Sequence, residues 1–195
     1  MAEELEIKLE ADGPQTLDEI ARDREIRDLA ETKTDWEMES VYYDTGAGDL
    51  TRRKWTLRRR RENDRQVIAM KTAGDGLIRG EWEYEGDLTD AAERLCAMGA
   101  PAELRQILSS PVEPVCGASF SRRAILLRFG DRSTAELALD LGCLFRGDKS
   151  APLAEAELEL KSGGPEAMLR LAEELKDHYG LRPQEKSKFL RAREL

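Results

Sequence analysis

The chain has 195 residues, of which 40% are hydrophobic and 36% are charged, and its formal net charge is −9. This length suits one domain with a sizeable core, and we expect residues 1–195 to form a single domain. The acidic balance argues against nucleic-acid binding driven by bulk charge. No apolar run is long enough to cross a membrane, so we expect neither nucleic acid nor membrane as a partner.

The three cysteines are widely spaced and form no CxxC motif, and the only histidine is His178. These features argue against most zinc sites and against a disulfide framework. The N-terminus enters a charged segment at once, which is unlike a signal peptide. Free thiols without a signal peptide predict a cytoplasmic protein.

The chain begins with an alternating segment, Glu4–Glu10, in which charged residues are spaced by two. Successive side chains of a strand point to opposite faces, so this segment predicts a strand with one ionic and one apolar face. A capping-box pattern that begins at Thr16 then predicts a helix to about Ala30.

The middle of the chain predicts four strands and two short helices. The strands are expected at 40–44, 55–61, 66–72 and 79–85, and the helices at 90–98 and 102–108. In the last of these strands Glu81 and Glu83 share a face opposite Trp82.

The second half predicts strands at 120–129, 134–141 and 155–161, a helix at 165–179 and an extended or turn-like tail at 187–191. Gly180 is a suitable residue to end that helix. About eight meandering strands with helices between them predict an α+β protein built on one antiparallel sheet.

The ionic faces of these strands are segregated by sign. Like charges spaced by two residues repel each other, and a divalent cation between carboxylates would offset that repulsion. An ionic face can be solvated, or it can line the lumen of a closed sheet. Separate acidic and basic stripes favour a lumen that binds metal ions and an anionic ligand. The stripes are Glu4/Glu6, Glu81/Glu83 and Glu157/Glu159 for the acids and Arg58/Arg60 for the bases.

The sequence resembles the CYTH superfamily, also called triphosphate tunnel metalloenzymes, in several blocks that occur in the family's order. The blocks are Glu4-x-Glu6-x-Lys8, Tyr42-Tyr43-Asp44-Thr45, Leu57-Arg58-Arg59-Arg60, Ala69-Met70-Lys71, Arg79-x-Glu81-Trp82-Glu83, Phe120-Ser121-Arg122, Glu136 to Gly142, Glu155-x-Glu157-x-Glu159 and Ser187-Lys188-x-x-Arg191.

This resemblance implies an eight-stranded antiparallel β-barrel, or tunnel, with flanking helices, which binds a small-molecule triphosphate together with Mg²⁺ or Mn²⁺. The implied metal ligands are Glu4, Glu6, Asp140, Glu155, Glu157 and Glu159. The implied phosphate-binding residues are Lys8, Arg58, Arg60, Lys71, Arg122, Lys188 and Arg191. The residues implied to take part directly in catalysis are Glu4, Glu6, Lys8, Glu83 and Lys188. Since Arg122 and Arg123 point to opposite faces, only one can join the site, and the resemblance favours Arg122.

The pattern is most similar to the bacterial inorganic triphosphatase type, which implies hydrolysis of tripolyphosphate to diphosphate and phosphate. An adenylate cyclase of class IV type and a thiamine or nucleoside triphosphatase are alternatives within the family. A non-catalytic polyphosphate-binding sensor is a third reading. A homodimer is expected only from the general frequency of twofold dimers.

Overall fold

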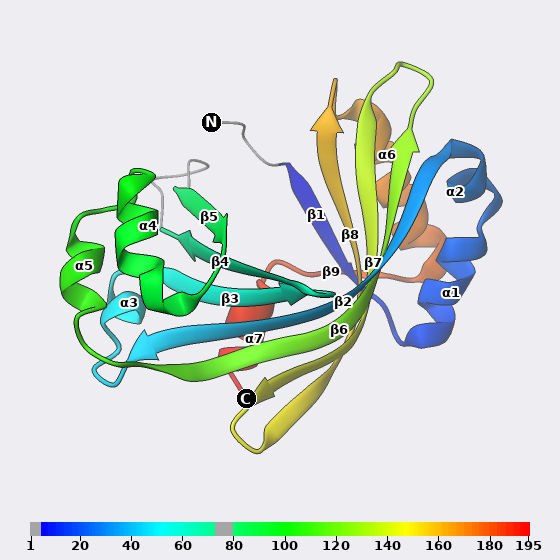
Figure 1. The fold of residues 1–195 in the computed structure, drawn as a ribbon. Helices are drawn as coiled ribbons and strands as arrows, with labels where there is room; N and C mark the ends of the chain where they lie inside the picture. The colour runs from blue at the N-terminus through cyan, green and yellow to red at the C-terminus, as the bar shows by residue number, and fades with distance from the viewer. Residues whose placement is uncertain (1–4, 73–79) are drawn as a thin grey trace. The chain divides into compact units, whose positions relative to one another are not determined.

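The computed structural model describes residues 5–72 and 80–195 (Figure 1). The chain forms two compact units, and it passes between them several times. Unit 1 contains residues 1–36, 120–143 and 152–187, and unit 2 contains residues 37–119, 144–151 and 188–195. Whether 1–195 acts as a single domain stays a prediction.

Nine strands of the described residues form one antiparallel sheet, with the hydrogen-bonded order β5-β4-β3-β2-β6-β7-β8-β1-β9. The strands are β1 (Glu6–Glu10), β2 (Ala30–Thr45), β3 (Thr56–Glu62), β4 (Arg65–Lys71), β5 (Glu81–Glu85), β6 (Val112–Arg128), β7 (Thr134–Arg146), β8 (Lys149–Ser162) and β9 (Arg182–Pro183). The predicted α+β class and antiparallel sheet are confirmed. The ninth strand is the short β9, and the pairing is not strictly closed, since β5 and β9 end the order among the described strands.

Seven α-helices and one short 3₁₀-helix accompany the sheet in the described part of the chain. They are α1 (Pro14–Arg22), α2 (Arg24–Leu29), α3 (Asp49–Arg52), η1 (Leu88–Asp90), α4 (Ala91–Ala97), α5 (Glu103–Ile107), α6 (Glu166–Tyr179) and α7 (Lys188–Arg193). None of the described helices has the length and apolar character that a membrane crossing needs.

In unit 1, helices α1, α2 and α6 cover the apolar face of the strands (Figure 1). Leu137, Leu139 and Leu158 point into this core and alternate with acidic neighbours on β7 and β8. From the helices, Ile20 and Leu171 are fully buried or nearly so. Alternation along the strands therefore leaves the opposite face of unit 1 to the ionic residues.

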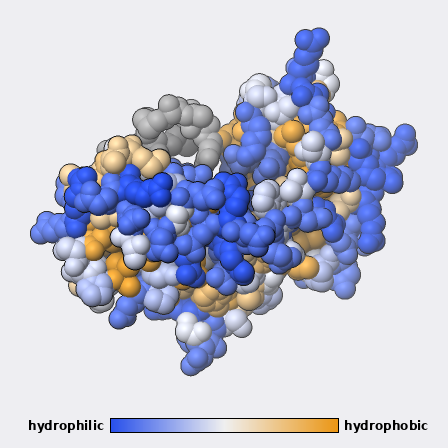
Figure 2. All heavy atoms as spheres, viewed as in Figure 1, coloured by the Kyte–Doolittle hydropathy of each residue, from blue (hydrophilic) through white to orange (hydrophobic). Residues whose placement is uncertain are grey.

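In unit 2, helices α3, α4 and α5 cover the apolar face of β3, β4 and β5 (Figure 1). Leu57, Ile68 and Tyr84 come from the three strands, and Leu95 and Leu104 come from the helices. On the face of the molecule drawn in Figure 2, hydrophilic residues predominate and apolar residues form small patches. The apolar residues are thus used mainly between strands and helices.

The N-terminal helix differs from the expected one. It begins at Pro14 rather than at Thr16, because proline is pre-organised for the first turn of a helix. Asp23 then separates α1 from α2, and its carboxylate accepts hydrogen bonds from the amides of Glu25 (2.7 Å) and Ile26 (3.4 Å). Local capping by Asp23 therefore ends one helix and starts the next.

The strand extents also differ. β2 begins ten residues before the predicted start at 40, and β6 begins eight residues before 120. The added segment of β2 is rich in exposed polar residues, so it carries little of the apolar alternation by which a strand is recognised. The added segment of β6 contains Pro114 and Gly117, two residue types that are rare inside strands. The tail predicted as extended is the helix α7.

Asp44 organises the turn that follows β2. Its carboxylate is buried and accepts hydrogen bonds from the backbone amides of Thr45 (2.8 Å), Leu50 (2.9 Å) and Thr51 (3.0 Å). Burial alone would raise the pKa of Asp44, but these hydrogen bonds outweigh it and lower the pKa below the ordinary value of 3.8. This part of the Tyr42–Thr45 block is therefore structural.

Replacing Asp44 should test this role. We expect Asp44→Ala to lower the free energy of unfolding by about 2 kcal/mol, because three backbone amides lose their acceptor. Since the pKa is depressed, the stabilisation by the carboxylate is present above pH 3.8 and is lost as the pH falls through the lower folded-state pKa. Urea unfolding of both proteins between pH 7 and pH 2.5 should show the difference shrinking in acid. A constant difference over that range contradicts the assignment.

Candidate metal and phosphate sites

Three buried carboxylates meet on the ionic face of unit 1. Asp140 on β7 and Glu155 on β8 are 0% exposed, and Glu157 on β8 is 7% exposed. One oxygen from each lies within 4.8 Å of the others. Carboxylate oxygens are the ligands that Mg²⁺ and Mn²⁺ prefer. This acidic cluster therefore suits a hard divalent cation, and the sequence analysis had selected all three of its members.

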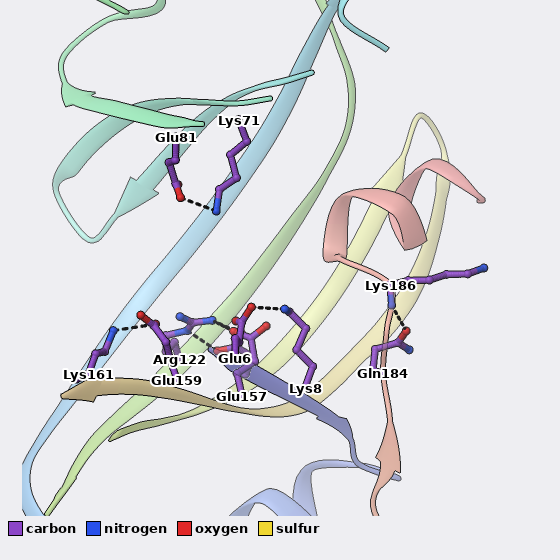
Figure 3. A network of polar contacts seen from close by, with 11 residues as sticks. Glu6, Lys8, Lys71, Glu81, Arg122, Glu157, Glu159, Lys161, Gln184 and Lys186 are labelled. Atoms are coloured by element: carbon purple, nitrogen blue, oxygen red, sulfur yellow. Dashed lines mark hydrogen bonds and ion pairs between the residues drawn. The ribbon is translucent and has the colours of Figure 1, made fainter. Parts of the chain in front are cut away.

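Two further predicted metal ligands, Glu6 and Glu159, lie beside this cluster at partly exposed positions. Strand β1 pairs with β8 so that Glu6 is opposite Glu159 and Lys8 is opposite Glu157. Glu6 forms an ion pair with Lys8, and Glu159 lies 2.8 Å from the ammonium of Lys161 (Figure 3). Neither glutamate belongs to a group of carboxylates close enough to share an ion, within residues 5–72 and 80–195. Glu4 lies outside the described residues.

Arg122 on β6 extends across the neighbouring strand β7 to reach β8 (Figure 3). Its Nε and Nη2 atoms donate to Asp140 at 2.7 Å each, and Nη2 also donates to Glu157 at 2.6 Å. Burial would lower the pKa of Arg122, but the hydrogen bond and charge of Asp140 and the charge of Glu157 raise it above its ordinary value. The guanidinium is therefore a permanent cation inside the acidic cluster.

The choice between two adjacent arginines is thus settled by their contacts. Arg123 points to the other side of β6 and lies 3.6 Å from Asp18 and 3.5 Å from Asp35, both of which are exposed. Arg122 joins the ionic face, as expected. Its partners in the structure are carboxylates, however, whereas the resemblance implied phosphate oxygens.

Unit 2 carries the predicted basic residues on the ionic face of β3 and β4. The register pairs Arg58 with Ala69, Arg60 with Val67 and Thr56 with Lys71, so these residues share one face. The Nε atom of Arg58 is buried and has no hydrogen-bond partner among the residues that the structure describes. A buried donor without an acceptor is costly, and an anionic oxygen would satisfy it.

The other basic residues of this face have acidic neighbours. Arg60 lies 2.5 Å from Glu62 and 3.6 Å from Glu83, and Lys71 lies 2.9 Å from Glu81. Glu81 and Glu83 are exposed on β5, which is at the end of the sheet. These glutamates are therefore placed to hold the basic side chains in position.

Lys188 and Arg191 lie on helix α7, three residues apart and hence on one face of it. Between them, the ring of Phe189 contacts Tyr42, with ring centroids 4.8 Å apart. Tyr42 is the direct cross-strand neighbour of Arg58. The sequence analysis missed this aromatic contact, because it depends on the position of α7 relative to β2.

Comparisons with known proteins identify relatives of this chain. A curated inorganic triphosphatase from Haemophilus influenzae is 29% identical over 139 residues, which are 70% of this chain and 39% of that protein. The chain thus spans about two-fifths of the length of this relative.

Two solved structures resemble the fold. An adenylyl cyclase candidate from Hippeastrum, described as having a dominant triphosphatase activity, superposes with a TM-score of 0.61 at 20% identity, over 98% of this chain and 95% of that one. A protein from Pyrococcus horikoshii OT3 gives a TM-score of 0.54 at 19% identity, over 95% and 96%. The CYTH domain model matches residues 2–192, nearly the whole sequence. The chain therefore belongs to the CYTH domain family.

Proposed function

We propose that this protein hydrolyses inorganic triphosphate to diphosphate and phosphate with the help of Mg²⁺ or Mn²⁺. The observation that carries the proposal is the buried cluster of Asp140, Glu155 and Glu157 in a chain of this family. The curated relative from Haemophilus influenzae is named an inorganic triphosphatase, which supports this substrate over thiamine triphosphate or a nucleotide.

The acidic cluster of unit 1 would hold the divalent ion. Its three members are buried hard-oxygen donors, which fit such an ion well. When bound, the ion would supply charge neutralisation and Lewis acidity to the phosphate groups. We also propose ligand roles for Glu4, Glu6 and Glu159, which the resemblance implies at these positions.

The basic side chains would bind phosphate oxygens and stabilise the phosphoryl group during transfer. Catalysis of phosphoryl transfer consists mostly of positioning and electrostatic stabilisation, so a set of fixed cations is the main requirement. Arg58 offers the clearest sign of such a role, because its buried Nε lacks an acceptor in the described structure. The proposed phosphate-binding set is Lys8, Arg58, Arg60, Lys71, Arg122, Lys188 and Arg191.

Glu83 and Lys188 are proposed to act directly in catalysis, together with Glu4, Glu6 and Lys8. Glu83 lies beside Arg60 at 3.6 Å, where its charge can orient the guanidinium. Lys188 is half-buried at the start of α7, which Phe189 fixes to Tyr42. A lysine held by a packed helix can place its compact charge on a phosphate with little loss of entropy.

The first test is substrate choice. Purified protein is incubated with Mg²⁺ or Mn²⁺ and, separately, with tripolyphosphate, ATP and thiamine triphosphate, and the products are identified. We expect phosphate and diphosphate from tripolyphosphate, formed much faster than any product from the other two. Cyclic AMP from ATP overturns the proposal in favour of a cyclase. Tight binding of tripolyphosphate without turnover favours a polyphosphate sensor.

The metal site is tested best at Glu155, because Arg122 is bonded to Asp140 and Glu157 and those bonds are left in place. Glu155→Gln keeps the shape of the side chain and removes its charge. We expect about tenfold weaker Mn²⁺ binding in calorimetry, since one anionic ligand is lost, and about 100-fold slower hydrolysis.

The matched control for this change is Glu113→Gln, which alters an exposed glutamate of β6. Its Mn²⁺ affinity and turnover should equal those of the unmodified protein. Unchanged Mn²⁺ binding by Glu155→Gln, at an unchanged melting temperature, removes Glu155 from the metal site.

The phosphate role of β3 is tested by a pair of neighbouring arginines. Arg59 points to the opposite face, where it lies 3.5 Å from Glu39 and its guanidinium lies over the ring of Tyr43 at 6.0 Å. We expect Arg58→Ala to raise the KM for tripolyphosphate about tenfold or more, because a charge-assisted hydrogen bond is lost. Arg59→Ala should leave the KM within about twofold of the unmodified value, because its partly exposed guanidinium faces away from Arg58. Equal effects of the two substitutions in steady-state assays contradict the assignment of Arg58.

A further inference from the structure

The acidic cluster of unit 1 faces an electrostatic problem when no metal is bound. Asp140, Glu155 and Glu157 place up to three negative charges within a few ångströms of one another and away from water. Burying charge without a partner is strongly unfavourable. A fold that forms before metal binds therefore needs a positive charge at this place.

Arg122 supplies that charge. Its guanidinium is bonded to two of the three carboxylates, Asp140 and Glu157. Only 20% of the Arg122 side chain is exposed, and its guanidinium also lies 5.7 Å from the centre of the Phe120 ring. The arginine is thus packed into the cluster and is not a mobile surface residue.

The guanidinium and a metal ion would use the same atoms. Arg122 engages both oxygens of Asp140 and the Oε2 atom of Glu157. A divalent ion held by the cluster would draw on these carboxylates and would also repel the guanidinium at short range. The contacts between Arg122 and the cluster would therefore be weakened by a bound ion.

We propose that Arg122 is a built-in counter-ion that competes with the metal: it holds the acidic cluster together in the metal-free protein, and metal binding releases its guanidinium toward substrate phosphate. This inference rests on the metal-binding part of the proposed function. Its consequence is a coupling between two ligands, since an ion that releases Arg122 increases the affinity for a polyphosphate, and the polyphosphate increases the affinity for the ion by the same factor.

The test measures metal binding without any substrate. Arg122→Gln removes the competing charge, so calorimetry should show Mn²⁺ binding at least about tenfold tighter than in the unmodified protein. The melting temperature without metal should fall, and its rise on adding Mn²⁺ should be larger than in the unmodified protein. Arg122→Lys keeps the charge and should bind Mn²⁺ with nearly unmodified affinity.

Arg123→Gln is the matched control, because it removes a neighbouring arginine that points away from the cluster. Its Mn²⁺ affinity should not change. Unchanged or weaker Mn²⁺ binding by Arg122→Gln overturns the inference and leaves the proposed hydrolysis standing. Absence of Mn²⁺ binding by the unmodified protein overturns both the inference and the metal-dependent function.

A second measurement needs no destabilising variant. The Nε–H signal of Arg122 in an arginine-selective nitrogen-15 spectrum is assigned by its loss in Arg122→Lys. Addition of Mg²⁺ to the unmodified protein without phosphate should shift this signal, because its acceptor on Asp140 is shared with the ion. A signal that stays in place while calorimetry reports bound Mg²⁺ overturns the competition.

Discussion

Mutual repulsion among carboxylates that cannot reach water is the constraint on which this structure depends most. Strand alternation sends the apolar side chains of β7 and β8 to the helices and gathers Asp140, Glu155 and Glu157 on the other face. The helix-covered core therefore fixes where the charges must lie. Arg122, which is bonded to Asp140 and Glu157, can be understood as a response to the repulsion.

The sequence was a good guide wherever a side chain's role follows from alternation. Asp140, Glu155 and Glu157 were expected as metal ligands because the resemblance to the CYTH family implied them, and these three meet in the structure. Alternation along one strand placed Arg58 and Arg60 on one face, which the register of β3 and β4 confirms. Alternation of side chains with a period of two residues is a local property, so the sequence of one strand is enough to reveal it.

Features that depend on a distant partner could not be predicted in this way. The pairing of Arg122 with Asp140 depends on the register between β6 and β7. The sequence pattern of either strand alone does not predict that register. The helix α7 was missed because six residues are too few to show a helical period, and the partner of its Phe189, Tyr42, lies far away in sequence. Helix α1 ends before the predicted Ala30 because the side chain of Asp23 bonds to the backbone amides of the next helix and caps it.

The chain passes repeatedly between the two units, with strands β2, β6, β7 and β8 each contributing residues to both. Neither unit is therefore a continuous piece of the sequence that could be excised and studied alone. The pairing of β1 with β8 joins segments from near the two ends of the chain, and such distant pairings form slowly during folding. During synthesis Asp140 emerges before Glu155 and Glu157, so the acidic cluster can assemble only after β8 has been made.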